Sequence, residues 1–465
     1  MKHEATVKKW YKLDNAAKII PSSAKGADTR VFRICCELKE EVKPEILQRA
    51  HDEIIDDFPM FRCVLKKGFF WYYLEDSVFR LEVTPDHLPA CAPIYYPGRV
   101  NLLYRVSYFN NRINLEMFHV LADGTGGFIF LKRLTARYLE LAHNVKTEKY
   151  EGETSSVTEK GDDAFDQYYM RQKLGKQLKQ LGKISVGKAH QIKGERDENL
   201  LPHLIEGTVS AGKIIALAKE NSTTVGVYTT ALYIKAVIGS MSLMEKAKPV
   251  VVSVPVNLRQ FFDSDTTRNF FGVINIVYYP KEYDGSLSSI IDSVKMQYEE
   301  QLKPDSVERI MNTYASFERH IAIKMVPIWI KDIVIDFFNR RSKSGVTTTL
   351  SNLGRIDMPE SIAPYIDRFS AFMAAPSQQV CISSFGDRMG FGEVSPYKTH
   401  DVMCNFFREL VSLGVDVELA SNDYDAHGEM KTVSDKKDIS QSETGTSRKA
   451  ARKEKNTSRK KRKQK

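Results

Sequence analysis

The chain has 465 residues and a mass of 53.0 kDa, which predicts two large domains and an appendage. Its formal charge of +9 is concentrated at one end, because residues 446–465 hold eleven Lys and Arg and one Glu while the rest of the chain carries −1. A hydrophobic content of 42%, with 24 Phe and 21 Tyr, excludes a disordered or collagen-like chain.

Hydropathy and cysteine usage indicate a cytoplasmic protein. The longest apolar stretch, residues 321–338, is interrupted by Lys324, Lys331, Asp332 and Asp336, so no membrane-spanning helix is expected. That stretch reads either as part of the core or as an amphipathic segment at a membrane surface. The first residues lack the apolar centre of a signal peptide. Six cysteines without a CxxC pair indicate neither a disulfide framework nor a metal site.

The first part of the chain alternates strand-like and helix-like segments. Apolar spacing and turn residues predict a strand at 31–39, a helix at 45–58, a hairpin at 61–75, a second hairpin at 103–120 and a helix at 128–142. The first hairpin is expected to turn at 66–68 and the second at 110–111. The five aromatic residues 69–73 predict a hydrophobic strand. Alternatively, they line a pocket for a substrate.

A polar stretch at 144–195 predicts a connection to a second half of similar α/β character. Helices are expected at 209–221, 227–241, much of 286–340 and 401–414, and strands at 250–257, 271–280, 347–353, 369–375 and 380–386. The predicted domains are therefore 1–185, 186–425 and a disordered basic tail at 426–465. The tail is either a solvated extension or a segment that binds anionic lipid or nucleic acid.

The most specific local pattern is His119-Val120-Leu121-Ala122-Asp123-Gly124, at a predicted junction between a strand and a helix. A neutral imidazole can accept a proton from a hydroxyl, because its ordinary pKa of about 6.5 lies near working pH. Asp123 could order the loop through an Arg partner, and Gly124 gives the backbone freedom to turn. The alternative is a structural histidine without a catalytic role.

Three segments, in order, resemble the CoA-dependent acyltransferase superfamily, which includes chloramphenicol acetyltransferase, condensation domains and alcohol acetyltransferases. The first is the HxxxDG motif at His119, the second is 254–280 with Arg259, Gly272 and Asn275, and the third is 347–359. The similarity extends over about 30–420 and is nearest to the alcohol acetyltransferase branch. It implies two chloramphenicol-acetyltransferase-like α/β sandwich halves with mixed sheets and an active-site tunnel between them.

The resemblance also implies roles for individual residues. His119 matches the general base, Asp123 and Gly124 complete the motif, and Asp123 with Arg259 matches a structural salt bridge. On the third segment Thr349, Ser351 and Asn352 are candidate oxyanion or substrate contacts. Strand alternation separates Asn352 from the other two. Ser351 is the favoured candidate, with an ordinary strand hydroxyl as the alternative. For Arg259 the alternative is a surface arginine, and Asn257 and Asn275 could simply satisfy backbone groups.

Two departures from the superfamily patterns limit the assignment. Condensation domains carry two adjacent histidines, whereas Phe118 precedes His119 here, and the DFGWG segment of plant enzymes is reduced to Gly390-Phe391-Gly392. The predicted function is therefore alcohol O-acetylation, with acetyl-CoA or another acyl-CoA as co-substrate and no bound cofactor or metal. Alternatives are a carrier-protein-dependent or condensation-type enzyme acting on a hydroxyl or amine, and a non-catalytic binding protein on this fold. We expect a cytoplasmic monomer that could associate peripherally with a membrane.

Overall fold

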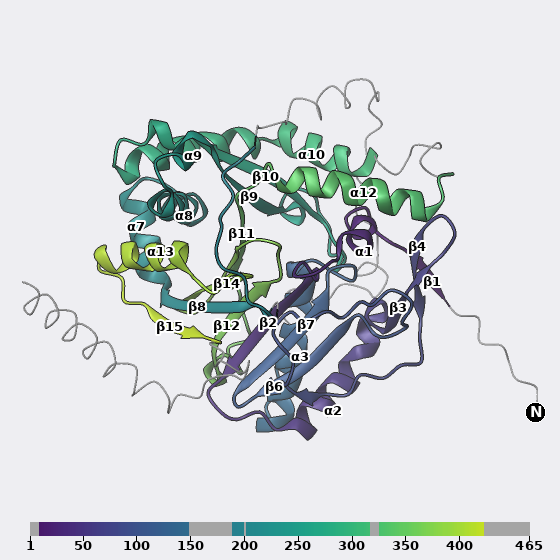
Figure 1. The fold of residues 1–465 in the computed structure, drawn as a ribbon. Coiled ribbons are helices and arrows are strands. Elements are labelled where there is room, and N and C mark those ends of the chain that lie inside the picture. Colours follow the sequence, from purple (N-terminus) through teal and green to yellow (C-terminus); the bar gives the residue numbers. More distant parts are fainter. Residues whose placement is uncertain (1–8, 148–187, 200, 317–324, 423–465) are drawn as a thin grey trace, which may run out of the picture. The chain divides into compact units, whose positions relative to one another are not determined.

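The computed structural model describes residues 9–147, 188–199, 201–316 and 325–422 (Figure 1). Within this part of the chain, three sheets and the helices packed on them form the fold. The predicted tail at 426–465 and most of the predicted connection at 144–195 lie outside the described residues. None of the described helices is long and apolar enough to cross a membrane.

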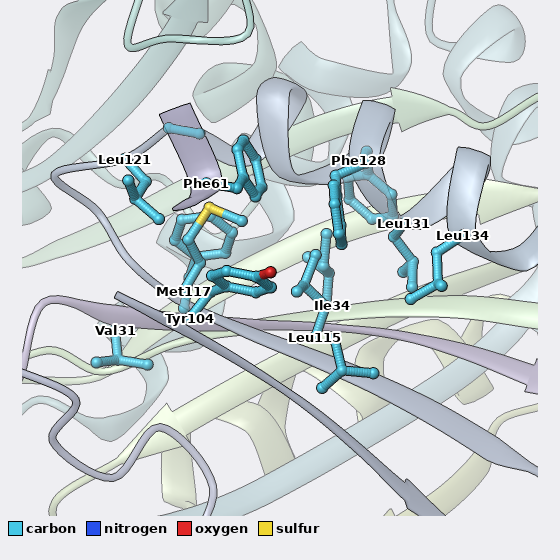
Figure 2. Close-up of a cluster of buried hydrophobic side chains, with 14 of the residues drawn as sticks. Val31, Ile34, Phe61, Tyr104, Leu115, Met117, Leu121, Phe128, Leu131 and Leu134 are labelled. Carbon is cyan, nitrogen blue, oxygen red and sulfur yellow. The ribbon is translucent and has the colours of Figure 1, made fainter. Parts of the chain in front are cut away.

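The first sheet has five strands in the order β12-β2-β7-β6-β5. Their bounds are β2 Val31–Leu38, β5 Thr84–Pro85, β6 Tyr104–Phe109, β7 Arg112–Phe118 and β12 Ile366–Met373. Neighbouring strands are antiparallel except β5 and β6, which are parallel. Helices α2 (Pro44–Ile54) and α3 (Gly124–His143) pack on one face, where Phe128, Leu131 and Leu134 of α3 point toward Ile34 and Leu115 of the sheet (Figure 2).

The second sheet has seven strands in the order β10-β9-β11-β13-β14-β8-β15. Their bounds are β8 His203–Ser210, β9 Val250–Asn257, β10 Phe271–Tyr278, β11 Thr348–Arg355, β13 Gln379–Phe385, β14 Arg388–Ser395 and β15 Glu418–Ser421. Strand β11 runs parallel to both of its neighbours, β9 and β13, whereas β9–β10, β13–β14 and β14–β8 are antiparallel. Both large sheets are therefore mixed, as predicted.

Helices on the second sheet supply a separate hydrophobic core. They are α7 (Ala211–Glu220), α8 (Val225–Ser240), α9 (Leu287–Gln301), α10 (Pro304–Ser316) and α13 (Asp401–Ser412). Helix α8 is apolar around most of its circumference and lies between α7, α9 and α13, which accounts for its almost complete burial. A small third sheet, β1-β4-β3, consists of Trp10–Lys12, Tyr72–Asp76 and Cys63–Lys67.

Strand β12 belongs to the second half of the sequence but completes the sheet of the first half, where it pairs with β2. It also packs against β14, and this approach requires Gly392, because a Cβ atom there would lie 2.2 Å from the carbonyl oxygen of Ala371. The described residues thus form two hydrophobic cores, and the first includes residues from both halves of the sequence. The domain limits predicted from the sequence remain a prediction.

Most predicted elements are confirmed at nearly the predicted residues, including both hairpins and the helix after the HxxxDG motif. Three differences have physical reasons. Residues 209–210, predicted as helix, end strand β8, and α7 begins only after Ser210 caps it by accepting from the Lys213 amide. Strand β14 was missed because its glycines weaken the strand pattern. Residues 69–71 lie in the turn between β3 and β4 rather than in a strand, because the Gly68 amide donates to the carbonyl oxygen of Trp71 at 2.8 Å; Phe69 and Trp71 are exposed there and Phe70 is half-buried.

The six cysteines are free thiols that differ in burial. Cys35, Cys36, Cys63, Cys91 and Cys381 are buried free thiols, whereas Cys404 is exposed. Burial raises the pKa of Cys35 and Cys381 to about 12, so these thiols are protonated at neutral pH.

Candidate active site

His119 directly follows the last residue of β7, in the turn that leads into α3. Its backbone N–H donates to the carbonyl oxygen of Arg30 at 2.9 Å, which ties the turn to the start of β2. The ring lies between two aromatic side chains, with Phe32 at 5.3 Å and Phe271 at 5.7 Å between ring centroids. Residues from both sheets therefore enclose His119.

Burial favours the neutral form of His119. Part of its surface remains exposed, but protein surrounds the ring closely enough that burial lowers its pKa below the ordinary value. The negative charge of Asp123 and hydrogen bonds of the ring to its own backbone and to Asn269 oppose this change without cancelling it. A neutral imidazole is the form that can accept a proton.

Asp123 is the N-cap of α3, and its carboxylate is fully engaged. Oδ1 accepts from the Gly126 amide at 2.9 Å, and Oδ2 accepts from the Phe270 amide at 2.9 Å. The guanidinium of Arg259 donates to Oδ2 at 2.8 Å and to Oδ1 at 3.3 Å. With its side chain 7% exposed, Asp123 has no free direction toward a ligand, so its role in the fold is to join the start of α3 to the segment before β10.

Arg259 organises residues 266–270, an irregular but buried segment between β9 and β10. Besides its two bonds to Asp123, it donates to the carbonyl oxygens of Thr266 and Arg268 and to Oδ1 of Asn257. Irregular backbone can be buried only when its polar groups are satisfied, and this guanidinium satisfies several of them. Asn257 in turn accepts from the Arg259 amide.

Two glycines, the last residue of the motif and one just after it, allow close packing around the start of α3. A Cβ atom at Gly126 would lie 1.9 Å from the carbonyl oxygen of Thr267, so only glycine permits the 266–270 segment to approach. Leu353 of β11 lies against Gly124, where a Cβ atom would be 2.6 Å from its Cδ2. Through these contacts, the loop after His119 meets both 266–270 and β11.

Asn269, at the centre of the 266–270 segment, reaches the ring of His119. Its Oδ1 lies 2.9 Å from Nδ1 of His119, and its Nδ2 donates to Oδ2 of Asp14 at 3.0 Å. Asp14 is buried, and its other carboxylate oxygen accepts from the Ala17 amide at 2.8 Å. Sequence reasoning missed both Asp14 and Asn269, which lie 105 and 150 residues from His119 in the sequence, and no local motif contains them together with His119.

Strand β11 presents its candidate residues on two faces, as alternation requires. Leu350 is buried in the second core, while Thr349, Ser351 and Leu353 lie on the opposite face, and Leu353 contacts Gly124 at the start of α3. Asn352 is exposed, and its Oδ1 accepts from the Gly354 amide at 2.9 Å. Thr349 and Ser351 are thus on the face that turns toward the motif, and Asn352 is used in a turn on the other.

The register of β10, β9 and β11 extends this face. Asn275 pairs with Ser253, which pairs with Thr349, so these three half-buried polar side chains form one row across three strands. Phe271, which contacts the ring of His119, lies on the same face of β10 as Asn275. Oδ1 of Asn275 is buried without a hydrogen-bond partner among the described residues. Gly272 points to the other face and packs against Ile310.

Comparisons with known proteins find no match to a family model and none to a curated protein. Solved structures do match over most of the chain. The trichothecene 15-O-acetyltransferase TRI3 of Fusarium sporotrichioides has a TM-score of 0.59 at 10% identity, covering 88% of this chain and 95% of its own. TRI101 of F. graminearum, complexed with ethyl coenzyme A, has a TM-score of 0.59 at 9% identity, with 88% and 100% covered.

A third similar structure is the starter condensation domain of rhizomide synthetase in complex with C8-CoA, with a TM-score of 0.59 at 11% identity. The alignment covers 87% of this chain and 95% of that domain. These matches confirm the predicted fold: the chain has the two-part α/β fold with mixed sheets that the CoA-dependent acyltransferases and condensation domains share.

Proposed function

We propose that this protein is an acyl-CoA-dependent O-acyltransferase that transfers an acyl group, acetyl in the first instance, to an alcohol. The observation that carries the proposal is the environment of His119, a half-buried imidazole whose pKa is lowered by burial and which lies at a strand end beside residues of both sheets. The similar structures with ethyl coenzyme A and C8-CoA support a CoA thioester as the donor. A tunnel between the two halves, which would admit the two substrates separately, belongs to this proposal.

In the proposed reaction His119 removes the proton from the acceptor hydroxyl as its oxygen attacks the thioester carbonyl carbon. The new C–O bond converts the carbonyl into a tetrahedral adduct with a negative oxygen. The adduct collapses by breaking the C–S bond, and the departing CoA thiolate takes up the proton held by the imidazolium. The products are an ester and free CoA, so no acyl-enzyme forms and no metal is needed.

Ser351 and Thr349 are the proposed hydrogen-bond donors to the negative oxygen of the adduct. They lie half-buried on the face of β11 that turns toward the start of α3. Asp123 and Arg259 have an indirect role, since their contacts are with each other and with the backbone around the site. Gly124 contributes room for Leu353 to pack against the start of α3 rather than a functional group.

The test combines purified protein with acyl-CoA donors of increasing chain length and a panel of alcohols, and measures release of the CoA thiol together with the ester product. We expect turnover that depends on both substrates. A donor presented on a carrier protein, and an amine acceptor, test the condensation-type alternative in the same assay. Turnover only with those substrates would contradict the proposal. Thioester binding without turnover in every combination would favour a non-catalytic binding protein.

A second proposal concerns location: the protein is a cytoplasmic monomer that contacts membrane surfaces through helix α12 (Ile328–Lys343). Ile333 and Phe337 of this helix are 66% and 64% exposed, and Trp329, Val334 and Phe338 are exposed beside them. The helix ends in the basic residues Arg340, Arg341 and Lys343. Exposed aromatic and aliphatic residues next to basic ones are typical of interfacial helices on anionic lipid.

The acidic residues of α12 support this orientation, because they face inward. Asp332 accepts from Ser22 at 2.6 Å and pairs with Lys67 at 2.9 Å, and Asp336 pairs with Lys25 at 3.0 Å. The apolar residues are therefore left on the solvent side.

Co-sedimentation with phosphatidylserine-containing vesicles tests the second proposal. A Trp329→Ser, Phe337→Ser variant is expected to lose binding, whereas Leu243→Ser, Met244→Ser, which removes even more exposed apolar side chains elsewhere, should bind as before. Removal of residues 446–465 separates the contribution of the basic tail, and binding to nucleic acid instead of vesicles would indicate the other use of that tail. Vesicle binding that survives the α12 substitutions would contradict the proposal.

A further inference from the structure

Three buried or half-buried polar residues from distant parts of the sequence form one hydrogen-bonded chain that ends at the proposed base. His119 Nδ1 lies 2.9 Å from Asn269 Oδ1, and Asn269 Nδ2 lies 3.0 Å from Asp14 Oδ2. Asp14 and Asn269 are each 1% exposed. Such complete burial of polar groups costs free energy unless their hydrogen bonds are made. The hydrogen bonds between these three side chains therefore fix their arrangement.

The direction of each hydrogen bond follows from the chemistry of Asp14. A carboxylate only accepts, and Asp14 accepts from the Ala17 amide at 2.8 Å with the guanidinium Nε of Arg268 at 3.7 Å as a counter-charge. The amino group of Asn269 must therefore face Asp14, which leaves its carbonyl oxygen facing His119. That oxygen also only accepts, so Nδ1 of His119 is the donor.

We infer that Asp14 and Asn269 are positioning residues that fix the tautomer of His119, with the proton on Nδ1 and the lone pair on Nε2. The inference rests on the proposed function, in which Nε2 accepts the proton of the acceptor hydroxyl. Asp123 does not have this role, because its carboxylate is occupied by Arg259 and two backbone amides. In the other tautomer Nε2 carries a hydrogen and cannot act as a base.

The expected size of the effect is bounded by a related case and by the site itself. In serine proteases, a change that favours the wrong tautomer of the catalytic histidine lowers kcat by about 10⁴-fold. Here the group facing Nδ1 of His119 is the neutral amide of Asn269 rather than a carboxylate, so it favours its tautomer less strongly. We therefore expect a smaller loss of kcat, on the order of 10²-fold.

The first variant, Asp14→Asn, keeps the size of the side chain and reverses the direction of the hydrogen bonds from Asp14 to His119. The Ala17 amide continues to need an acceptor, so it retains the oxygen of the new amide and turns the new amino group toward Asn269. Two amino groups then face each other, and the Asn269 amide turns over and presents its own N–H groups to Nδ1 of His119. We expect kcat to fall about 10²-fold while KM for the acyl-CoA changes little.

The decisive variant is the exchange Asp14→Asn with Asn269→Asp. The amino group at position 14 now donates to the carboxylate at position 269, whose second oxygen accepts from Nδ1 of His119. Activity should recover toward the wild-type value. Because a carboxylate then lies beside the ring, the acid limb of the pH profile of kcat/KM should move to higher pH. The matched control is Asn15→Asp, which makes the same amide-to-carboxylate change as Asn269→Asp, but at the residue next to Asp14. It should leave the pH profile unchanged.

Nitrogen NMR of ¹⁵N-histidine-labelled protein at pH 8 without substrate reads the tautomer directly, with His119→Ala used to assign the signal. We expect Nδ1 protonated in the wild type and a shift toward Nε2 protonation in Asp14→Asn. This readout does not depend on turnover, so it separates failure of the inference from failure of the proposed function. An Nε2-protonated ring in the wild type, an unchanged tautomer in Asp14→Asn, or an exchange variant that does not recover would each overturn the inference.

Discussion

The buried pair of Asp123 and Arg259 allows a quantitative prediction about the stability of the site. Replacing Arg259 by Met leaves the Asp123 carboxylate buried with only its two backbone donors, and replacing Asp123 by Asn leaves the guanidinium without a counter-charge. Removing one partner of a buried ion pair costs about 3–5 kcal/mol, because the remaining charge stays desolvated. The carbonyl oxygens of Thr266 and Arg268 lose their donor only when Arg259 is replaced.

The double variant is expected to cost much less than the sum of the single variants, because the second substitution removes the uncompensated charge that the first one leaves. The coupling should be about 2 kcal/mol or more. Urea unfolding followed by tryptophan fluorescence measures all three variants against the wild type, and CoA release measures their activity. The buried ion pair would not have the predicted effect if each single variant lost less than about 1 kcal/mol of unfolding free energy. The same holds if the losses of the two single variants summed to that of the double variant.

Three further predictions concern the same site. The pH profile of kcat/KM should rise through a pKa below the ordinary histidine value of about 6.5, because burial favours neutral His119. For the same reason the folded state should lose stability as the pH falls from about 6.5 toward the lowered pKa of folded His119, because only the unfolded state binds the proton in that range. An acid limb above the ordinary histidine value would contradict this. Gly126→Ala should destabilise the fold more than Gly124→Ala. The new Cβ meets the rigid Thr267 backbone at 1.9 Å in the first case and a movable leucine side chain in the second. Differential scanning calorimetry compares the two variants, and equal melting temperatures would argue against the close approach at Gly126. Ser351→Ala should lower kcat by about 10²-fold with an unchanged unfolding midpoint, and an unaltered kcat would remove Ser351 from the proposed oxyanion contacts.

Sequence reasoning predicted the parts of the fold that depend on local pattern. The alternation in 250–257 and 271–280 and the helical spacing after His119 are strong, and the corresponding elements form at nearly those residues. The crossing of β12 into the first sheet could not be predicted, because it depends on long-range packing that becomes possible only where Gly392 allows it. Strand β14 was missed for a related reason, since Gly392 and its neighbour Gly390 lower the strand propensity of this segment.

The candidate site shows the same division. His119 and Asp123 lie in one short motif, and Arg259 was located because the resemblance covered its segment; the structure brings Arg259 to Asp123. Asn269 directly precedes Phe270 and Phe271 in that segment, and no sequence pattern distinguishes it. Asp14 lies near the start of the sequence, where the residue pattern bears only on the question of a signal peptide. Their connection to His119 exists only after three remote segments pack together. The face of Asn352 was correctly separated from that of Ser351 by alternation alone.

The central claim is that His119 accepts a proton from an alcohol during direct transfer from acyl-CoA. The most direct test measures ester formation by mass spectrometry for wild-type protein and for His119→Ala, with acetyl-CoA and the best alcohol of the panel. We expect ester and CoA in equal amounts from the wild type, and at least a 10²-fold lower rate from the variant at unchanged stability. Ester formation by His119→Ala at the wild-type rate would contradict it.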